Sequence, residues 1–139
     1  MTLRSAADPK YIRPLTRLID RAAGPLDFAG YQAEGGYAAF RKAVTQQPAD
    51  VQAVVKASNL RGRGGAGFPT GVKWSLIPMG PDAGAKYMVC NADEMEPGTF
   101  KDRLLMEQVP HQLIEAMLIA AYAIQATTGY IFLLSLIHI

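Results

Sequence analysis

Residues 86–133 read KYMVCNADEMEPGTFKDRLLMEQVPHQLIEAMLIAAYAIQATTGYIFL, and the pattern of this stretch indicates the fold class. Residues 86–91 form an apolar run between a Pro-Asp-Ala-Gly turn and an acidic loop, which is typical of a buried strand. Apolar residues then recur at helical spacing over 112–125, and the aromatic and β-branched residues of 129–133 predict a second buried strand. A strand, a helix and a strand in this order indicate a right-handed βαβ crossover, and therefore an α/β fold with a parallel sheet.

Residues 116–139 contain no Lys, Arg, Asp or Glu, and a run of this length is the usual signature of a membrane-spanning helix. Gln125 and Gly129 interrupt the run, and the strand-like residues after them fit a buried strand better than a continuous helix. We therefore predict a helix followed by a strand, with no direct insertion into a membrane. The last six residues, 134–139, continue the strand without a turn and match one reading frame of a common sequencing adapter. We expect them to be an artefact, so His138 receives no functional role.

Short helices are predicted on either side of the first strand. Residues 37–44 and 50–58 have helical character, with Pro48 near the start of the second helix and Asn59 as its left-handed terminator. A further short helix is expected at 102–108.

The N-terminal segment, residues 1–37, contains several prolines and a glycine pair and is interpreted as an arm or cap. One short helix is expected within it, at about 15–22. A chain of 139 residues with 50% hydrophobic content can bury one compact core but not two, so we expect at most a single α/β unit.

The composition narrows the class of protein. Lys and Arg number 14 against 12 Asp and Glu, so no strong field of either sign points to nucleic acid as a partner. Cys90 is the sole cysteine, so it cannot form an internal disulfide or, by itself, a zinc or iron–sulfur site. Residues 1–8 lack the apolar region of a secretory signal, and we expect a reducing, cytoplasmic location.

Residues 62–71, GRGGAGFPTG, hold five glycines in ten positions. Backbone amides in such a loop can approach a ligand closely and cradle phosphate oxygens. A flexible linker is the alternative interpretation, although Phe68, Arg61 and Arg63 are unusual in linkers. Phe68 either stacks on a ligand ring or simply packs, and Lys73 is either a phosphate ligand or a solvated lysine.

The positions of Gly62, Gly64 and Gly67 match G-x-G-x-x-G, but a dinucleotide fingerprint also requires a preceding strand and a following helix. Here a helix is predicted before the loop and Phe-Pro-Thr-Gly follows, so the Rossmann fingerprint is excluded. The P-loop motif fails as well, because one residue separates Lys73 from Gly71 and no Ser or Thr comes directly after the lysine. A nucleotide held by this loop would therefore be bound in a geometry of its own.

Three carboxylates, Asp93, Glu94 and Glu96, lie in the loop NADEMEPG at 91–98, directly after the first predicted strand. In open α/β sheets, ligands bind beyond the carboxyl ends of the strands. Carboxylates at that place can accept from ribose or ribityl hydroxyls, or hold a divalent cation. A solvated acidic turn is the competing interpretation, but the position after a strand favours a ligand site.

The two motifs together resemble a known family. The stretches RGRGGAGFPTGVKWS at 61–75 and CNADEMEPGTFKDR at 90–103 closely resemble the NADH-binding, FMN-carrying subunit of bacterial respiratory complex I. The resemblance extends over residues 14–133, and a similar module occurs in NAD-linked hydrogenases and formate dehydrogenases. It implies a partial, Rossmann-like parallel sheet, in which residues 38–133 are the first part of an FMN- and NADH-binding domain.

The resemblance also implies a function, that of an NADH dehydrogenase in which hydride passes from NADH to FMN and electrons continue through iron–sulfur clusters to quinone. Glu96 would be the catalytic residue, helping to place the nicotinamide side. Phe68 would stack on the nucleotide, and Lys73 would lie near phosphate. The residues that would contact FMN and NAD(H) are Gly62, Arg63, Gly64, Gly65, Ala66, Gly67, Phe68, Pro69, Thr70, Gly71, Lys73, Asn91, Asp93 and Glu94. The cysteine-rich 4Fe–4S domain of the family is expected to lie beyond this sequence, so no metal ligand is assigned.

The partners that the resemblance implies are NADH and the other subunits of the peripheral arm of complex I, above all a thioredoxin-like subunit with a 2Fe–2S cluster. The implied location is the cytoplasmic face of the bacterial plasma membrane. Two alternatives stay open. One is the diaphorase subunit of an NAD-linked hydrogenase or formate dehydrogenase, and the other is a non-catalytic module that binds an anion or nucleotide. The isolated 139 residues are expected to be inactive, because unpaired sheet edges promote aggregation.

Overall fold

The computed structural model describes residues 13–20 and 22–133 of the chain. The helices and strands in chain order are α1 (Phe28–Ala33), α2 (Ala38–Ala43), α3 (Pro48–Ala57), α4 (Thr70–Ser75), the 3-10 turn η1 (Pro81–Ala83), β1 (Tyr87–Ala92), α5 (Lys101–Gln108), α6 (Pro110–Ile124) and β2 (Thr128–Leu133). Residues 134–139, which the sequence predicts to be an artefact, lie outside the described residues.

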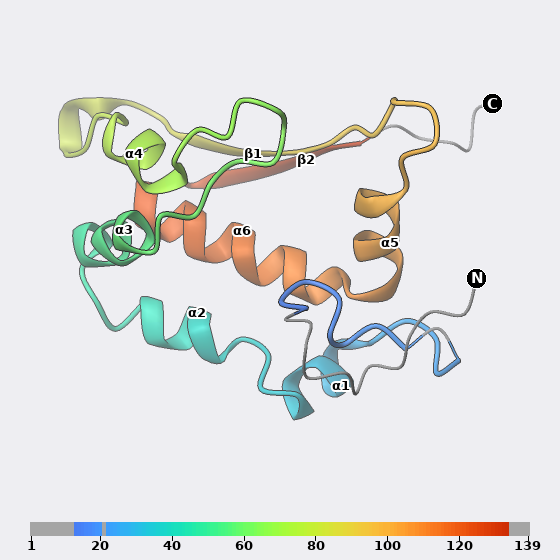
Figure 1. Cartoon of the computed structure of the whole chain (residues 1–139). Helices are drawn as coiled ribbons and strands as arrows, with labels where there is room; N and C mark the ends of the chain where they lie inside the picture. Colours follow the sequence, from blue (N-terminus) through green and yellow to red (C-terminus); the bar gives the residue numbers. More distant parts are fainter. Residues whose placement is uncertain (1–12, 21, 134–139) are drawn as a thin grey trace.

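β1 and β2 form a parallel pair, in which Tyr87 lies opposite Thr128 and Ala92 lies opposite Leu133. The crossover between them contains α6, which packs against both strands and lies below the sheet in Figure 1. The predicted strand, helix and strand are therefore confirmed, each within two residues of its expected bounds. The α/β class with a parallel sheet is confirmed as well.

The expectation that the second strand is buried is wrong. Every residue of β2 is exposed, with Tyr130 at 55% and Phe132 at 60%. In β1 only Ala92 is buried. A parallel sheet becomes buried when helices cover both of its faces, and among the described residues α6 covers one face. The strands have the apolar sequence of a buried sheet, but one of the two covering layers is absent from the described part of the chain.

Residues 116–133 divide between the end of α6 and β2, as predicted. Pro110 is the first residue of α6. Proline has no N–H, but an N–H at the start of a helix would have no partner within the helix, so no bond is lost. It ends at Gln125, whose φ of 59° is left-handed and therefore stops the helix. Across the described ranges, no helix is both long enough and apolar enough to span a membrane.

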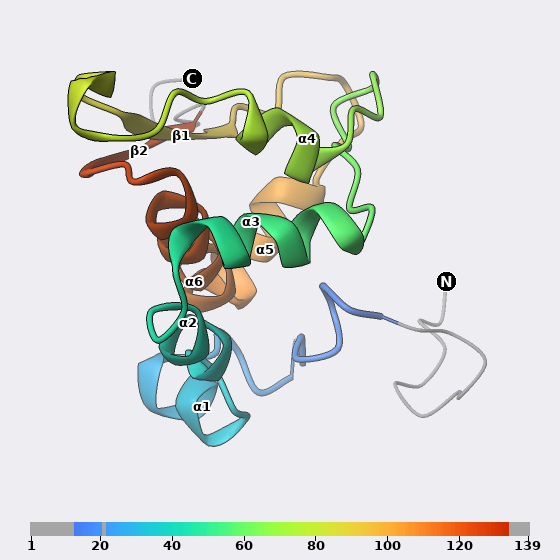
Figure 2. The same ribbon diagram turned by 90° about the vertical axis from the view of Figure 1, so that its left-hand side faces the viewer.

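The core lies where α2, α3 and α6 come together (Figure 2). Its buried residues and those packed around them are Ala43, Val51, Ala123, Trp74, Ile119 and Tyr122. Gly71 lets α4 approach α3 closely, because a β-carbon there would lie 2.3 Å from the Lys56 Cα. Only glycine permits that approach, so Gly71 fixes how α4, and the loop before it, sit on the core.

The helices predicted at 37–44, 50–58 and 102–108 are confirmed as α2, α3 and α5. Pro48 occupies the start of α3, and Asn59 after it has the expected left-handed backbone, with a φ of 51°. Neither α1 nor α4 was predicted from the sequence. Both are only six residues long, too short for the helical period to stand out in the sequence.

The helix expected at about 15–22 is wrong. The described part of that segment forms turns, in which the Arg17 N–H donates to the Arg13 carbonyl (3.0 Å). None of the described residues 13–20 is buried, and a short helix needs tertiary packing to be stable. The helix forms instead at α1, where the Asp27 side chain caps the Gly30 N–H (2.8 Å) and Tyr31 is buried.

Candidate functional site

The glycine-rich segment between α3 and α4 forms a closed loop. At its base the Thr70 N–H donates to the Leu60 carbonyl (2.8 Å), and the Gly62 N–H donates to the Phe68 carbonyl (2.9 Å). The two sides of the loop also meet in an isolated antiparallel bridge. A loop tied in this way has a defined shape, so the flexible-linker interpretation is wrong.

Two glycines inside the loop are required by its backbone conformation, because Gly65 and Gly67 have φ values of 107° and 61°. A β-carbon at Gly64, Gly65 or Gly67 would meet no heavy atom within 4 Å. The space beside these three residues is therefore open. Residues 62–66 are exposed, so a ligand can reach the main chain in this part of the loop.

A cavity of about 400 Å³ lies between the glycine loop, α4 and β1. Sequence-predicted site residues that line it are Gly62, Gly64, Ala66, Gly67, Phe68, Thr70 and Lys73. Lining residues that were not predicted from the sequence are Trp74, Ile77, Tyr87, Met88, Val89 and Ile124. The volume falls within the range of roughly 300–1,000 Å³ that is typical of small-molecule sites.

The walls of this cavity are mostly apolar. Phe68 is 48% exposed, so its ring is available to a ligand. Lys73, on α4, is the charged residue among those that line the cavity. The combination of an aromatic ring, open main-chain amides and a cation suits a flat ring that carries an anionic group.

Part of the missed lining was readable from the sequence. Trp74 lies four residues after Thr70, so the two share a side of α4 once that helix is known from the structure. Tyr87 and Val89 are two positions apart on β1 and therefore share a face of the strand. Ile124, the α6 residue that lines the cavity, had no such signal in the sequence, because only the tertiary fold brings the end of α6 close to the loop.

Eight of the site residues predicted from the sequence do not line the cavity: Arg63, Gly65, Pro69, Gly71, Asn91, Asp93, Glu94 and Glu96. Gly71 instead packs against α3. The exclusion of the Rossmann fingerprint holds, because α3 and not a strand precedes the loop. A helix, α4, does follow the loop, contrary to the prediction, so the missing strand alone excludes the fingerprint.

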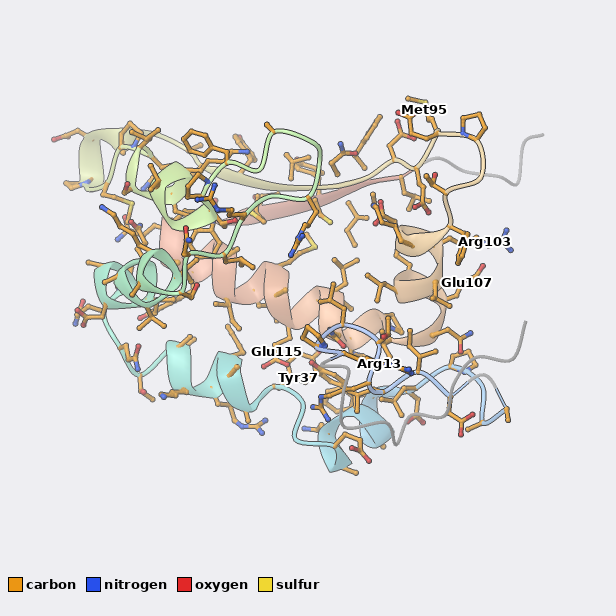
Figure 3. The ribbon with its side chains drawn as sticks, viewed as in Figure 1. Arg13, Tyr37, Met95, Arg103, Glu107 and Glu115 are labelled. Atoms are coloured by element: carbon orange, nitrogen blue, oxygen red, sulfur yellow. The ribbon has the colours of Figure 1, made fainter. Side chains whose placement is uncertain are left out.

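The acidic loop leaves the carboxyl end of β1 and returns to α5, with Met95 near its tip (Figure 3). The Glu94 carboxylate accepts from the Asp102 N–H (3.1 Å) and the Arg103 N–H (3.1 Å), and so it caps α5. Desolvation raises the pKa of Glu94. Hydrogen bonds from main-chain N–H groups, of which that of Arg103 has the largest effect, outweigh desolvation and hold the pKa below its ordinary value. Glu94 is therefore held as a carboxylate by the start of the helix.

Asp93, beside it, has a different environment. Its N–H donates to Asn91 Oδ1 (3.1 Å), which closes a local turn. Its own Oδ1 atom is buried and accepts no hydrogen bond. An unpaired buried carboxylate oxygen is costly, so this atom fits the place where a ligand hydroxyl donates. The chemistry agrees with the ribose or ribityl hydroxyl expected from the sequence.

Glu96 is exposed, and its main-chain carbonyl accepts from the Thr99 N–H (3.1 Å). The hypothesis that Asp93, Glu94 and Glu96 hold a divalent cation is wrong. Within the described ranges, no group of three His, Cys, Asp or Glu side chains could hold a metal ion. The physical reason is that the Glu94 oxygens are turned toward the start of α5.

A second capping carboxylate, Glu115 on α6, was not predicted from the sequence. It is 7% exposed and accepts from the Tyr31 hydroxyl (2.6 Å), the Tyr37 N–H (2.9 Å) and the Phe40 N–H (3.0 Å). Figure 3 has Glu115 and Tyr37 next to each other between α6 and α2. Desolvation raises the pKa of Glu115, but the Tyr31 hydroxyl and the main-chain N–H groups together hold it below its ordinary value. This carboxylate joins the N-terminal helices to α6.

Residues 55–135 match the family described as the Nuo51 FMN-binding domain. The chain belongs to this family. The matched range contains both the glycine loop and the acidic loop, so the cavity and the unpaired Asp93 oxygen lie within the FMN-binding domain.

Relatives of this Nuo51 family member align with most of the chain, and three of them are named as F subunits of NADH-quinone oxidoreductases. The second such protein of Rhizobium meliloti is 55% identical over 120 residues, which is 86% of this chain and 28% of that protein. The Escherichia coli protein is 52% identical over 121 residues, which is 86% of this chain and 27% of that protein. The Salmonella typhimurium protein has the same identity and coverage. The chain thus spans little more than a quarter of the length of these relatives.

Among solved structures, the FMN-binding domain is similar to part of an NAD+-reducing NiFe hydrogenase. The air-oxidised form matches with a TM-score of 0.58 and 45% identity, over 63% of this chain and 15% of that chain. The H2-reduced form matches with a TM-score of 0.55 and 43% identity. The likeness shows that this chain shares the fold of that part of the hydrogenase.

Proposed function

We propose that this chain is part of the flavin subunit of respiratory complex I, an NADH dehydrogenase that feeds electrons toward quinone. The observation that carries the proposal is the cavity beneath the glycine loop, with Phe68 and Lys73 in its walls. Relatives that are named as NADH-quinone oxidoreductase subunits, and that align with 86% of the chain, support it.

FMN is the cofactor that these residues fit. The open main-chain amides around Gly64 and Gly67 would hold its phosphate together with Lys73, and Phe68 would contact a ring. Asp93 would accept from a ribityl hydroxyl through its unpaired oxygen. The chemistry that FMN supplies is acceptance of a hydride from NADH and release of the two electrons one at a time to iron–sulfur clusters.

NADH is the proposed substrate, and Glu96 is the proposed catalytic residue. Its side chain is exposed beyond the carboxyl end of β1, where it can reach the nicotinamide side of a bound NADH. Because the cofactor carries the redox chemistry, Glu96 orients the substrate and needs no proton-transfer role.

The proposed partners are other peripheral-arm subunits of complex I, including the thioredoxin-like 24 kDa-type subunit, at the cytoplasmic face of the membrane. Relatives named as subunits of a quinone oxidoreductase support an assembly. Met95 at 67% and Phe100 at 63% exposure give the acidic loop an apolar outer surface suited to a protein neighbour.

A diaphorase subunit of an NAD-linked hydrogenase is the second candidate, favoured by the likeness to the NAD+-reducing hydrogenase structures. Sequence following residue 133 in the source DNA separates the two. A continuation that aligns with the NADH-quinone oxidoreductase relatives favours complex I, and one that aligns with the hydrogenase favours the diaphorase.

Flavin binding tests the proposal directly. The 139-residue chain and its extended gene product are incubated with FMN and passed through a desalting column. Bound flavin is then measured by absorbance, and the samples are titrated with NADH without oxygen. We expect the extended product to retain FMN and to be bleached by NADH. Retention of inorganic phosphate but not FMN would identify a non-catalytic anion-binding module instead. Failure of the extended product to retain flavin would refute the assignment.

A further inference from the structure

The Glu94 carboxylate already accepts hydrogen bonds from the protein, which leaves little of it to contact a cofactor. Its Oε1 accepts from the Asp102 N–H (3.2 Å), and its Oε2 accepts from the Asp102 and Arg103 N–H groups (both 3.1 Å). The Lys101 ammonium lies 3.9 Å from Oε1. The side chain is only 10% exposed. Both oxygens therefore face protein donors.

The start of α5 depends on this carboxylate. The residue at the N-cap position, Phe100, makes no side-chain capping bond. The first N–H groups of a helix have no acceptor within the helix. In α5 the Glu94 carboxylate, on the far side of the loop, accepts from two of them. Each of these bonds also ties residue 94 to residues eight or nine positions later, so the acidic loop is closed between β1 and α5.

Asp93 is the immediate neighbour of this tie, and its Oδ1 is buried without a partner. Holding the Glu94 side chain fixes the main chain on which Asp93 is mounted. We infer that Glu94 is a positioning residue that aims the unpaired Asp93 oxygen at a hydroxyl of the bound flavin. The inference rests on the proposed function and revises the role expected for Glu94 from its sequence, which was direct cofactor contact.

A helix cap and a positioning tie can be separated experimentally, because the cap can be rebuilt locally. Glu94→Ala removes both. Phe100→Asp places a capping side chain at the N-cap itself, without joining α5 to residue 94. The double variant, Glu94→Ala with Phe100→Asp, restores the cap but not the tie. Phe100→Asp alone is the matched control.

All variants are made in the extended gene product and freed of FMN. FMN affinity is then measured by the quenching of flavin fluorescence, and the melting temperature is measured on the same samples. We expect Glu94→Ala to lower both FMN affinity, by about tenfold, and the melting temperature. The double variant is expected to regain the melting temperature of the Phe100→Asp control while its FMN affinity stays about tenfold weaker. Recovery of both in the double variant overturns the inference, because Glu94 would then be a helix cap only.

Glu94→Gln decides the matter if the local cap fails to restore the melting temperature. Glutamine keeps one oxygen that can accept from the Asp102 N–H, so the tie persists without the charge. We expect FMN affinity within about twofold of the wild type, since an uncharged acceptor still closes the loop. A loss as large as that of Glu94→Ala contradicts a positioning role.

Failure of the inference is distinct from failure of the proposed function. A wild-type protein that binds no FMN removes the function itself. A wild type that binds FMN, with a double variant that binds equally well, removes only the role of Glu94.

Discussion

Two glutamates in different regions of the fold use the same chemistry. Glu115 caps α2 from α6, across 75 positions of sequence to Phe40, and Glu94 caps α5 from 8 positions away. The first belongs to the region that joins the N-terminal helices to α6, and the second to the acidic loop at the end of β1. The first carboxylate holds helices together, and the second lies beside Asp93, whose unpaired oxygen is part of the proposed cofactor site.

The donors aimed at a carboxylate therefore decide its role, and its sequence neighbours do not. Glu94 attracted a ligand assignment because other acidic residues surround it. Glu115 attracted none because it stands alone in an apolar helix. If this difference holds, substitutions at packed or capping positions should change the free energy of unfolding, and substitutions beside the proposed ligand should change FMN affinity.

Truncating Glu115 should have the largest effect. Glu115→Ala leaves the Tyr31 hydroxyl and the main-chain donors of α2 without an acceptor, and we expect a loss of about 3 kcal/mol in the free energy of unfolding. Urea denaturation measures it. Glu107→Ala is the control, because Glu107 is a half-exposed partner of Arg103, and its loss should cost less than about 0.5 kcal/mol. Equal losses in the two variants would contradict the capping role.

Gly71→Ala should come second. The new β-carbon would lie 2.3 Å from the Lys56 Cα, so α4 must move away from α3. We expect a loss of about 2 kcal/mol in the free energy of unfolding, seen as a lower denaturation midpoint. An unchanged midpoint would contradict the role of Gly71 in the packing of α4 against α3.

Acid should lower the stability of the protein through protonation of Glu115. The folded-state pKa of Glu115 lies below its ordinary value of 4.5, so its stabilising contribution is fully present above that pH. The contribution is lost as pH falls through the depressed folded pKa. We expect melting temperature to drop below about pH 4.5 in the wild type, and to drop less steeply in Glu115→Gln. Parallel curves for the two proteins would assign acid sensitivity to other groups.

Gly64→Ala should have the smallest effect on stability. A β-carbon at Gly64 meets no atom within 4 Å, and the residue has no left-handed backbone, so unfolding should change by less than about 0.5 kcal/mol. If the loop holds the cofactor closely, the added methyl should still lower FMN affinity by about tenfold. Unchanged FMN affinity would place the cofactor elsewhere. Gly71→Ala is the matched control, because the same substitution there is expected to lower stability.

The sequence predicted much of the fold because the deciding signals are local. The apolar run of β1, the helical period of α6 and the aromatic residues of β2 each depend on neighbours in the chain, and their parallel pairing followed from their order. The glycine loop was found from its composition alone. The short helices α1 and α4 escaped, because six residues give too few repeats of the helical period.

Local pattern was enough to establish the α/β class, the order of the main elements and the two motifs that join the chain to the Nuo51 family. The folded arrangement was needed to learn which motif residues share a cavity, that Gly71 packs against α3, and that Asp93 and not Glu94 has a free oxygen. The physical reason is that hydrogen-bond donors and covering surfaces come from distant parts of the chain. A motif specifies which groups are available, and the folded chain decides which of them are already used.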